Sequence, residues 1–176
     1  MDGIEVIDNF LEEESFNELQ KFFISPRSQW RFVDFVVSKN QDNQKKDGYF
    51  VHSFRDLHPV TFEDRFPISP NYDVLYKLLD KLKKKVNFNQ ILRIRSSLFP
   101  RREKQNPDAF HVDYKFDHKV CIFYINTNNG YTVFEDGTKI NSVANRICIF
   151  PYYLKHSGTT CTNANRRIAL NINYVR

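Results

Sequence analysis

Residues 166–174 read RRIALNINY, and apolar and polar side chains alternate along this stretch from Arg167 onward. Successive side chains of a β-strand point to opposite faces, so the alternation predicts a strand with two different surfaces. One surface is apolar and suited to packing against helices, and it consists of Ile168, Leu170, Ile172 and Tyr174. The other surface carries Arg167, Ala169, Asn171 and Asn173. We therefore expect this strand to separate an apolar layer from a polar interior.

The arginine on the polar surface is a candidate anion-binding residue. Burying a guanidinium beside a small alanine is costly unless an anionic group neutralises it. The planar fork of donors on arginine also matches a carboxylate better than a lysine ammonium does. Arg166 lies on the apolar side and can turn to solvent, which favours Arg167. Two alternatives stay open: the register can differ by one residue, or both arginines are exposed at a frayed strand start.

Upstream of this strand, short extended segments alternate with turns. They cover residues 90–99, 119–126, 131–135, 138–143 and 146–151. The sequences Asn128-Asn129-Gly130 and Asp136-Gly137 supply the positive-φ residues that tight hairpin turns need. Strands this short favour closure into a barrel or a two-sheet jelly roll, because closure limits exposed sheet edges.

The first half of the sequence mixes helices and strands. Residues 4–7 and 30–37 are rich in β-branched or aromatic residues and predict strands. Helical spacing predicts a helix over 11–23 with Phe16, Leu19 and Phe23 on one face, and Ser69-Pro70 is expected to open a second helix. The apolar face of that second helix would consist of Leu75, Leu78, Leu79, Leu82 and Val86. The predicted fold is α+β and mainly β: a jelly roll with one or two N-terminal supporting helices.

Length and composition limit the class of protein. The 176 residues are 41% hydrophobic and 15% aromatic, too apolar for a disordered chain. We expect a single domain over 1–176, with helical support and first strands in 1–89 and the jelly-roll core in 90–176.

No apolar run approaches the roughly 18 residues of a membrane span, and the N-terminal residues lack the features of a secretory signal. With three cysteines and no Cys-x-x-Cys pair, a reducing cytoplasm fits best.

The strongest chemical signal is the sequence Phe110-His111-Val112-Asp113. If this stretch is a strand, His111 and Asp113 point to the same face. His156 follows several strand-like segments later. Two histidines and one carboxylate on one face of an octahedron leave three positions open, the arrangement of non-haem iron(II) oxygenases. A His-x-Asp pair alone is more often a surface turn or a core histidine held by a carboxylate.

Together, His111-x-Asp113, His156 and Arg167 resemble the 2-oxoglutarate- and iron(II)-dependent oxygenases. The sequence is most similar to the prolyl-4-hydroxylase-like branch and its small phage-type members, in detail over residues 91–174 and again at residues 4–11. The resemblance implies a cupin-like double-stranded β-helix in which His111, Asp113 and His156 are the metal ligands and catalytic residues. It also implies that Arg167 and Tyr124 bind the distal carboxylate of 2-oxoglutarate.

The same resemblance implies Fe(II), 2-oxoglutarate and O₂ as cofactor and cosubstrates, with ascorbate as an optional addition. The cytoplasm expected from the cysteines would be that of the host if the gene is phage-encoded. One departure concerns Phe99-Pro100, where relatives often carry Tyr-Pro. A phenylalanine cannot donate the hydroxyl hydrogen bond that 2-oxoglutarate receives from that tyrosine. The affinity or orientation of the cosubstrate is therefore expected to differ.

The substrate is less defined than the chemistry. Family analogy favours hydroxylation of a protein or peptide side chain, with proline as the first candidate target. A nucleic-acid base is an alternative, because basic residues gather over 81–104, although Asn173 occupies the position where base-demethylating relatives carry another arginine. The alternative from another class is a non-catalytic jelly-roll module or a zinc site. Specificity is expected to come from the polar loops 41–48 and 101–109, and no membrane partner is expected. The oligomeric state is left open.

Overall fold

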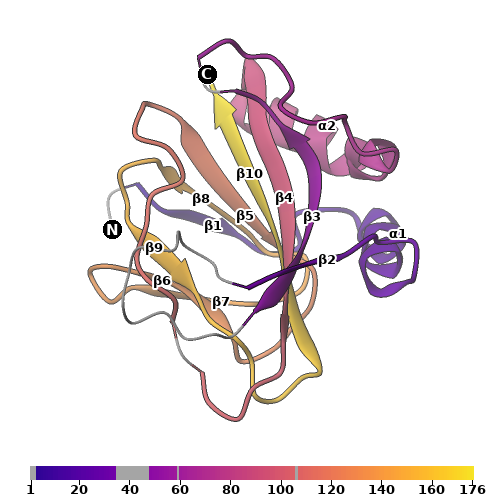
Figure 1. Cartoon of the computed structure of the whole chain (residues 1–176), viewed down its shortest axis with the longest axis vertical. Coiled ribbons are helices and arrows are strands. Elements are labelled where there is room, and N and C mark those ends of the chain that lie inside the picture. Colours follow the sequence, from indigo (N-terminus) through magenta and orange to yellow (C-terminus); the bar gives the residue numbers. More distant parts are fainter. Residues whose placement is uncertain (1–2, 35–47, 59, 106) are drawn as a thin grey trace.

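The structure is a computed structural model of the chain and describes residues 3–34, 48–58, 60–105 and 107–176. Figure 1 shows two helices on one side of a large twisted sheet and a smaller sheet on its other side. The elements are β1 (Glu5–Ile7), α1 (Glu13–Ile24), β2 (Arg31–Val33), β3 (Tyr49–Asp56), the 3₁₀ turn η1 (Tyr72–Leu75), α2 (Tyr76–Val86), β4 (Gln90–Pro100), β5 (Lys119–Tyr124), β6 (Tyr131–Phe134), β7 (Lys139–Asn141), β8 (Ile147–Pro151), β9 (His156–Gly158) and β10 (Arg166–Val175).

The strands form two antiparallel sheets. The large sheet has the order β1-β8-β5-β10-β4-β3-β2, and the small sheet has the order β7-β6-β9. Strand β10 lies at the centre of the large sheet and pairs with β4 on one side and β5 on the other. This arrangement confirms the expected mainly β, jelly-roll fold with two supporting helices. Strands from both halves of the chain share the large sheet.

The helices cover the apolar face of β10. Ile168, Leu170, Ile172 and Tyr174 belong to one buried cluster with residues of both helices, among them Phe16, Leu19, Leu78 and Leu82. Burying one such side chain is worth about 1.5–3 kcal/mol relative to leaving it exposed. The predicted apolar spacing of both helices is therefore confirmed. Neither helix among the described residues has the length and apolar character needed to cross a bilayer.

The basic residues of α2 lie on its outer side. Lys83, Lys84 and Lys85 are exposed, and several lysines of this helix form ion pairs, including Lys81 with Glu12 and Lys85 with Glu5. Exposed ion pairs of this kind contribute only about 0–1 kcal/mol each. The helical part of the basic stretch identified in the sequence is thus the solvated side of an amphipathic helix, whereas Arg93 and Arg95 lie on β4.

Several local predictions need correction. The helix expected to open at Ser69-Pro70 begins later, with η1 at Tyr72, because the Ser69 hydroxyl accepts the backbone N–H of Asn71 and holds a turn there. Of the strand predicted over 30–37, the described part is β2, and residues 35–37 lie outside the described range. Strands β3 and β9 were not predicted, the latter because it spans three residues.

Only one of the two predicted hairpin turns is confirmed. Gly137 has a φ of 87°, and Asp136 accepts the N–H of Thr138 across the turn between β6 and β7. In contrast, none of Asn128, Asn129 and Gly130 has a positive φ. There, the Asn128 side chain accepts the N–H of Gly130 and closes the turn with ordinary backbone angles.

Asn145 connects the N-terminal segment to the large sheet. Its side chain accepts the N–H of Leu11 at 2.8 Å and donates to the carbonyl of Leu11 at 2.8 Å, and both bonds are buried. Its φ of 63° lies in the left-handed region, which asparagine tolerates better than most residues. One residue therefore satisfies two polar groups of the segment that leads into α1.

We expect Asn145→Ala to lower the free energy of unfolding by about 3 kcal/mol, with about 1 kcal/mol from each lost hydrogen bond and about 1 kcal/mol from the left-handed backbone. Asn145→Gly loses the same hydrogen bonds without the backbone penalty and should be about 1 kcal/mol less harmful. Urea unfolding of the three proteins measures both effects. Full stability of the alanine variant would contradict the anchoring role.

Candidate active site

The three predicted metal-ligating side chains lie together. The ligand atoms of His111, Asp113 and His156 are all within 4.8 Å of one another, and no other such group occurs in the described parts of the chain. His156 lies on β9, and an isolated β-bridge joins it to His111, with reciprocal N–H···O bonds of 3.1 and 3.0 Å. The segment around His111 is not the regular strand expected from the sequence, because it pairs with β9 at this single bridge.

Both imidazoles present Nε2 toward the site. The Nδ1 atom of His111 lies 3.2 Å from the carbonyl of Ala109, and Nδ1 of His156 lies 3.2 Å from the carbonyl of Leu154. A hydrogen bond to a carbonyl requires a proton on Nδ1, so each Nε2 keeps a lone pair. Burial lowers the pKa of His156 to about 4, and the nearby Asp113 carboxylate offsets only part of this effect. His156 is therefore neutral at pH 7 and able to bind a metal ion.

Asp113 is held in place as a charged carboxylate. Arg93 donates to its Oδ1 at 2.6 Å, and Asn171 on β10 donates to its Oδ2 at 3.0 Å. Burial by itself would raise the pKa of Asp113, but the charge of Arg93, aided by both histidines and Asn171, holds that pKa well below its ordinary value. The group that would carry negative charge at a metal site is thus ionised and oriented before any metal binds.

Arg167, not Arg166, is the arginine inside the protein. Its residue is 2% exposed, and its hydrogen bonds go to neutral hydroxyl groups, Ser142 Oγ at 2.7 Å and Thr132 Oγ1 at 3.2 Å. Burial lowers the pKa of Arg167, so the guanidinium is poorly solvated and favours an anionic partner. Arg166 is half-buried. Of the two neighbouring arginines, Arg167 is therefore the one on the interior face of the strand.

The chain makes room for this guanidinium with two glycines. A Cβ added at Gly130 would lie 2.6 Å from Cδ of Arg167, and one added at Gly158 would lie 3.3 Å from its Nη1. The Phe99 and Tyr124 rings lie 5.5 and 5.6 Å from its guanidinium carbon. Gly130 is therefore required for close approach to Arg167, and not for a positive φ.

Tyr124 contributes to the site through a second residue. Its buried hydroxyl donates to Thr132 Oγ1 at 2.8 Å, and the same oxygen accepts a hydrogen bond from Arg167. Sequence reasoning missed Thr132 and Ser142. A threonine in the otherwise apolar strand β6 was the available signal, whereas Ser142 follows β7 without a distinctive pattern.

The three metal-ligating side chains, Arg167 and Thr132 line one cavity of about 90 Å³. It is lined by Tyr49, Arg93, Arg95, Ser97, Phe99, Asp108, His111, Asp113, Ile122, Thr132, His156, Gly158, Arg167, Ala169 and Asn171. Asn171, which contacts Asp113, and Arg167 lie four residues apart on the same face of β10, about 13 Å at the rise of a strand. A small dicarboxylate can therefore lie between the metal-ligating group and the arginine. Of the two predicted specificity loops, 101–109 contributes Asp108 to this cavity, and 41–47 lie outside the described residues.

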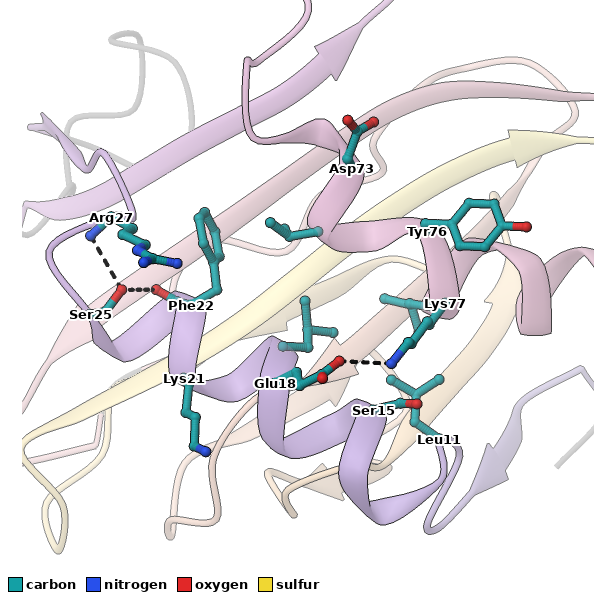
Figure 2. A pocket seen from close by; sticks show the side chains of 13 residues that line it. Leu11, Ser15, Glu18, Lys21, Phe22, Ser25, Arg27, Asp73, Tyr76 and Lys77 are labelled. Carbon is teal, nitrogen blue, oxygen red and sulfur yellow. Dashed lines mark hydrogen bonds and ion pairs between the residues drawn. The ribbon is translucent and has the colours of Figure 1, made fainter.

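A larger groove of about 550 Å³ lies elsewhere, between α1 and the η1–α2 segment. Figure 2 shows it crossed by the ion pair of Glu18 and Lys77, whose charged atoms are 2.7 Å apart. The described residues that line it include no histidine or cysteine. It lies against the helices, on the side of the large sheet away from His111, Asp113 and His156. We therefore assign the chemistry to the smaller cavity.

The remaining histidines have other surroundings. His52 stacks on Phe54 with ring centres 4.3 Å apart, and His118 packs among aromatic rings. His58 is exposed and accepts backbone hydrogen bonds within its own turn. None of them belongs to the metal-ligating group, in agreement with the sequence prediction.

The sequence matches no family model and no curated protein. The fold does match solved structures. A prolyl hydroxylase from Trichoplax adhaerens, in complex with a hypoxia inducible factor oxygen degradation domain peptide fragment, has 13% identity and a TM-score of 0.68, with 99% of this chain and 84% of that chain covered. A 2OG-Fe(II) oxygenase family oxidoreductase from Burkholderia pseudomallei has 12% identity and a TM-score of 0.70, with 98% and 85% covered.

A viral collagen prolyl hydroxylase from Paramecium Bursaria Chlorella virus-1, in complex with 2OG, has 13% identity and a TM-score of 0.63, with 99% of this chain and 97% of that chain covered. The chain therefore has the fold that these oxygenases share, over nearly its full length. The fold expected from the sequence is confirmed by this likeness.

The buried neutral His156 should make the metal-free protein sensitive to mild acid. As pH falls below about 6.5 the unfolded chain binds a proton at this histidine, whereas the folded chain does so only near pH 4, so stability is lost over that range. At about 1.4 kcal/mol per pKa unit, the loss reaches about 3 kcal/mol.

Urea unfolding at several pH values, in the presence of a chelator, measures this loss. The same measurement on His156→Gln gives the pH dependence that comes from all other titrating groups, so the difference from the wild type is the contribution of His156. His58→Gln is the matched exposed-histidine control. Parallel pH curves for the wild type and His156→Gln would contradict the assignment.

Proposed function

We propose that this protein is a non-haem iron(II) oxygenase that uses 2-oxoglutarate and O₂ to hydroxylate a side chain of a protein or peptide. The observation that carries the proposal is the presence, in one cavity, of a two-histidine, one-carboxylate group and a buried arginine whose partners are neutral. A metal ligand set alone, or a buried arginine alone, has simpler explanations. The cysteines are free and buried, which supports the cytoplasmic location expected from the sequence.

His111, Asp113 and His156 fit the metal of this chemistry. Two neutral imidazoles and one carboxylate suit Fe(II) and leave coordination positions open for ligands from outside the protein. Arg93 and Asn171 orient the carboxylate, and the two backbone carbonyls orient the imidazoles, as partners of metal ligands commonly do. The Phe150 ring lies 4.9 Å from the His156 ring and shields it from water on one side.

Arg167 fits the distal carboxylate of 2-oxoglutarate. Its guanidinium can donate two parallel hydrogen bonds to a carboxylate, which is stronger than its present contacts with hydroxyl groups. Thr132 and Ser142 fix the plane of the guanidinium. Tyr124 acts here as a positioning residue, since its hydroxyl is directed to Thr132. Direct contact between Tyr124 and the carboxylate, as the family resemblance implies, requires that hydroxyl to turn.

With iron and 2-oxoglutarate bound, O₂ would be the oxidant: 2-oxoglutarate would give up two electrons and CO₂ and take one oxygen atom to become succinate, and the other oxygen atom would go to the substrate. The chain itself binds and orients. Arg167 sets the direction of the dicarboxylate, Asp113 balances the charge of the metal, and Phe99 forms an apolar wall beside Arg167. A wall without a hydroxyl group favours a dry site, in which these charge interactions are stronger than in water.

We favour a protein or peptide substrate over a nucleic-acid base, although Arg93 and Arg95 of the basic stretch line the cavity. The basic side of α2 faces outward from the helix layer, away from the cavity, and part of it is neutralised by ion pairs. Asn173 is fully buried and hydrogen-bonds to Asn171, so it is not available to a base. Salt-sensitive binding of single-stranded DNA or RNA at the cavity would overturn this preference.

We expect conversion of 2-oxoglutarate to succinate to require Fe(II) and O₂ and to fall more than about 100-fold in His111→Ala, because loss of even an indirect partner of a metal ligand costs about 10- to 100-fold. Arg167→Ala should lose activity chiefly through a higher KM for 2-oxoglutarate. Arg166→Ala, the neighbouring control, should stay within about twofold of wild type. Succinate formation measures all three, and full turnover in His111→Ala would reject the proposed chemistry.

Binding can be tested without turnover. Under nitrogen, Mn(II) and 2-oxoglutarate together should raise the Tm of the wild type by several degrees, since ligands at about 100 times their Kd add about 2.7 kcal/mol. The shift should disappear in Asp113→Ala. Stabilisation by Zn(II) alone, with no further effect of 2-oxoglutarate, would instead support a non-catalytic metal-binding module.

A further inference from the structure

A third arginine faces the cavity without an acidic partner. Arg95 lies on β4, and the inward side of that strand also carries Arg93, Ser97 and Phe99. Its guanidinium hydrogen-bonds to the Tyr49 hydroxyl and lies 5.8 Å from the centre of the Tyr49 ring. Within the described ranges, no carboxylate is within ion-pair distance of Arg95. Arg93, by comparison, is committed to Asp113.

Arg95 and Arg167 occupy different levels of the cavity. In the register between β10 and β4, Arg95 is opposite Asn171, and Arg167 is opposite Phe99. Because Asn171 contacts Asp113, Arg95 lies at the level of the metal-ligating group. Arg95 is also half-buried, whereas Arg167 is almost fully enclosed. A molecule that enters from outside can therefore reach Arg95 while 2-oxoglutarate occupies the space beside Arg167.

Tyr49 holds the Arg95 guanidinium in place. It is 1% exposed and stacks on Phe99, with ring centres 5.1 Å apart and planes inclined by 7°. The ring is thus fixed by strand β4, and its hydroxyl is directed at Arg95. An arginine whose side chain is already ordered loses less conformational entropy when it binds an anion. The arrangement has the features of a prepared binding group.

The cavity carries more positive than negative charge. Three arginines and two aspartates line it. Asp113 is paired with Arg93, and the charge of Asp108 acts on Tyr49 and Arg167. The net charge of +5 for the whole chain also attracts acidic molecules toward the surface. At the level of Asp113, Arg95 is therefore the arginine without a carboxylate partner among the described residues, and it faces the entering substrate.

We infer that Arg95, oriented by Tyr49, binds a carboxylate of the substrate beside the C–H bond that reacts. The inference rests on the proposed function and specifies its substrate class: peptides with an aspartate or glutamate next to the hydroxylated residue. An arginine fork binds a carboxylate through two hydrogen bonds, and an uncharged amide offers a weaker match. Arg95 is thus a specificity-determining residue, distinct from the arginine assigned to the cosubstrate.

The test compares two fluorescent peptide pools with a central proline, one flanked by aspartate and the other by asparagine. Binding to the full chain loaded with Mn(II) and 2-oxoglutarate, under nitrogen and at about 0.15 M salt, is measured by fluorescence anisotropy. We expect the aspartate pool to bind at least about tenfold more tightly, the scale of one charge-assisted contact. Arg95→Met should abolish the preference, and Tyr49→Phe should reduce it while keeping the ring stack.

Two further variants separate this contact from general attraction. Arg101→Met removes an exposed arginine that does not line the cavity, and it should keep the preference. Arg95→Glu should reverse it, toward a third pool flanked by lysine. Equal binding of the aspartate and asparagine pools to the wild type overturns the inference, as does an Arg95→Met effect confined to the Kd of 2-oxoglutarate.

A different result would reject the proposed function itself. Absence of Fe(II)-dependent succinate formation rejects the oxygenase, whatever the peptide preference shows. A preference for aspartate that persists in Arg95→Met would place acidic recognition elsewhere and also overturn the inference.

Discussion

The two faces of strand β10 meet opposite physical demands. One face packs into the apolar cluster under the helices, and the other carries Arg167, Asn171 and Asn173 toward the interior of the jelly roll. A slip of one residue would bury Arg167 among apolar side chains and turn Ile168, Leu170 and Ile172 toward the cavity. Pairing with β4 along its whole length and with β5 over half of it fixes the register. The positions of Arg167, and of Asn171 that holds Asp113, depend on this register.

Within the cavity, some charges neutralise each other and others do not. Arg93 and Asp113 form an ion pair in which the carboxylate side chain is 4% exposed and the arginine side chain 17% exposed, and Asn171 satisfies the second carboxylate oxygen. Breaking such a pair would leave an uncompensated buried charge, at a cost of about 3–5 kcal/mol. Arg167 and Arg95 have hydroxyl groups as partners instead. A hydroxyl orients a guanidinium without neutralising it. We therefore expect the two unpaired arginines to bind ligands, whereas the paired one holds Asp113 in place.

Two local errors of the sequence interpretation share a cause. The stretch around His111 alternates like a strand, yet only one bridge to β9 forms, because β9 is three residues long. Gly130 resembles a hairpin glycine, yet the side chain that requires its small size is that of Arg167, which belongs to a strand from another part of the chain. In both cases the deciding contact joins segments that are distant in sequence. Local patterns contain no information about such contacts.

The sequence by itself determined the residue types of the site and the layer that supports it. Alternation in residues 166–174 and helical spacing at Phe16 and Leu82 are short-range patterns that reflect the repeats of a strand and of a helix. The His-x-Asp spacing is also short-range, although its segment forms only a single bridge. Only the tertiary structure decided which arginine is buried, how Thr132 and Ser142 meet it, and that Tyr49 stacks on Phe99 to hold Arg95. Those facts arise from pairing among β3, β4 and β10 and from packing of β6 against them, where desolvation and shape act between residues that no local pattern connects.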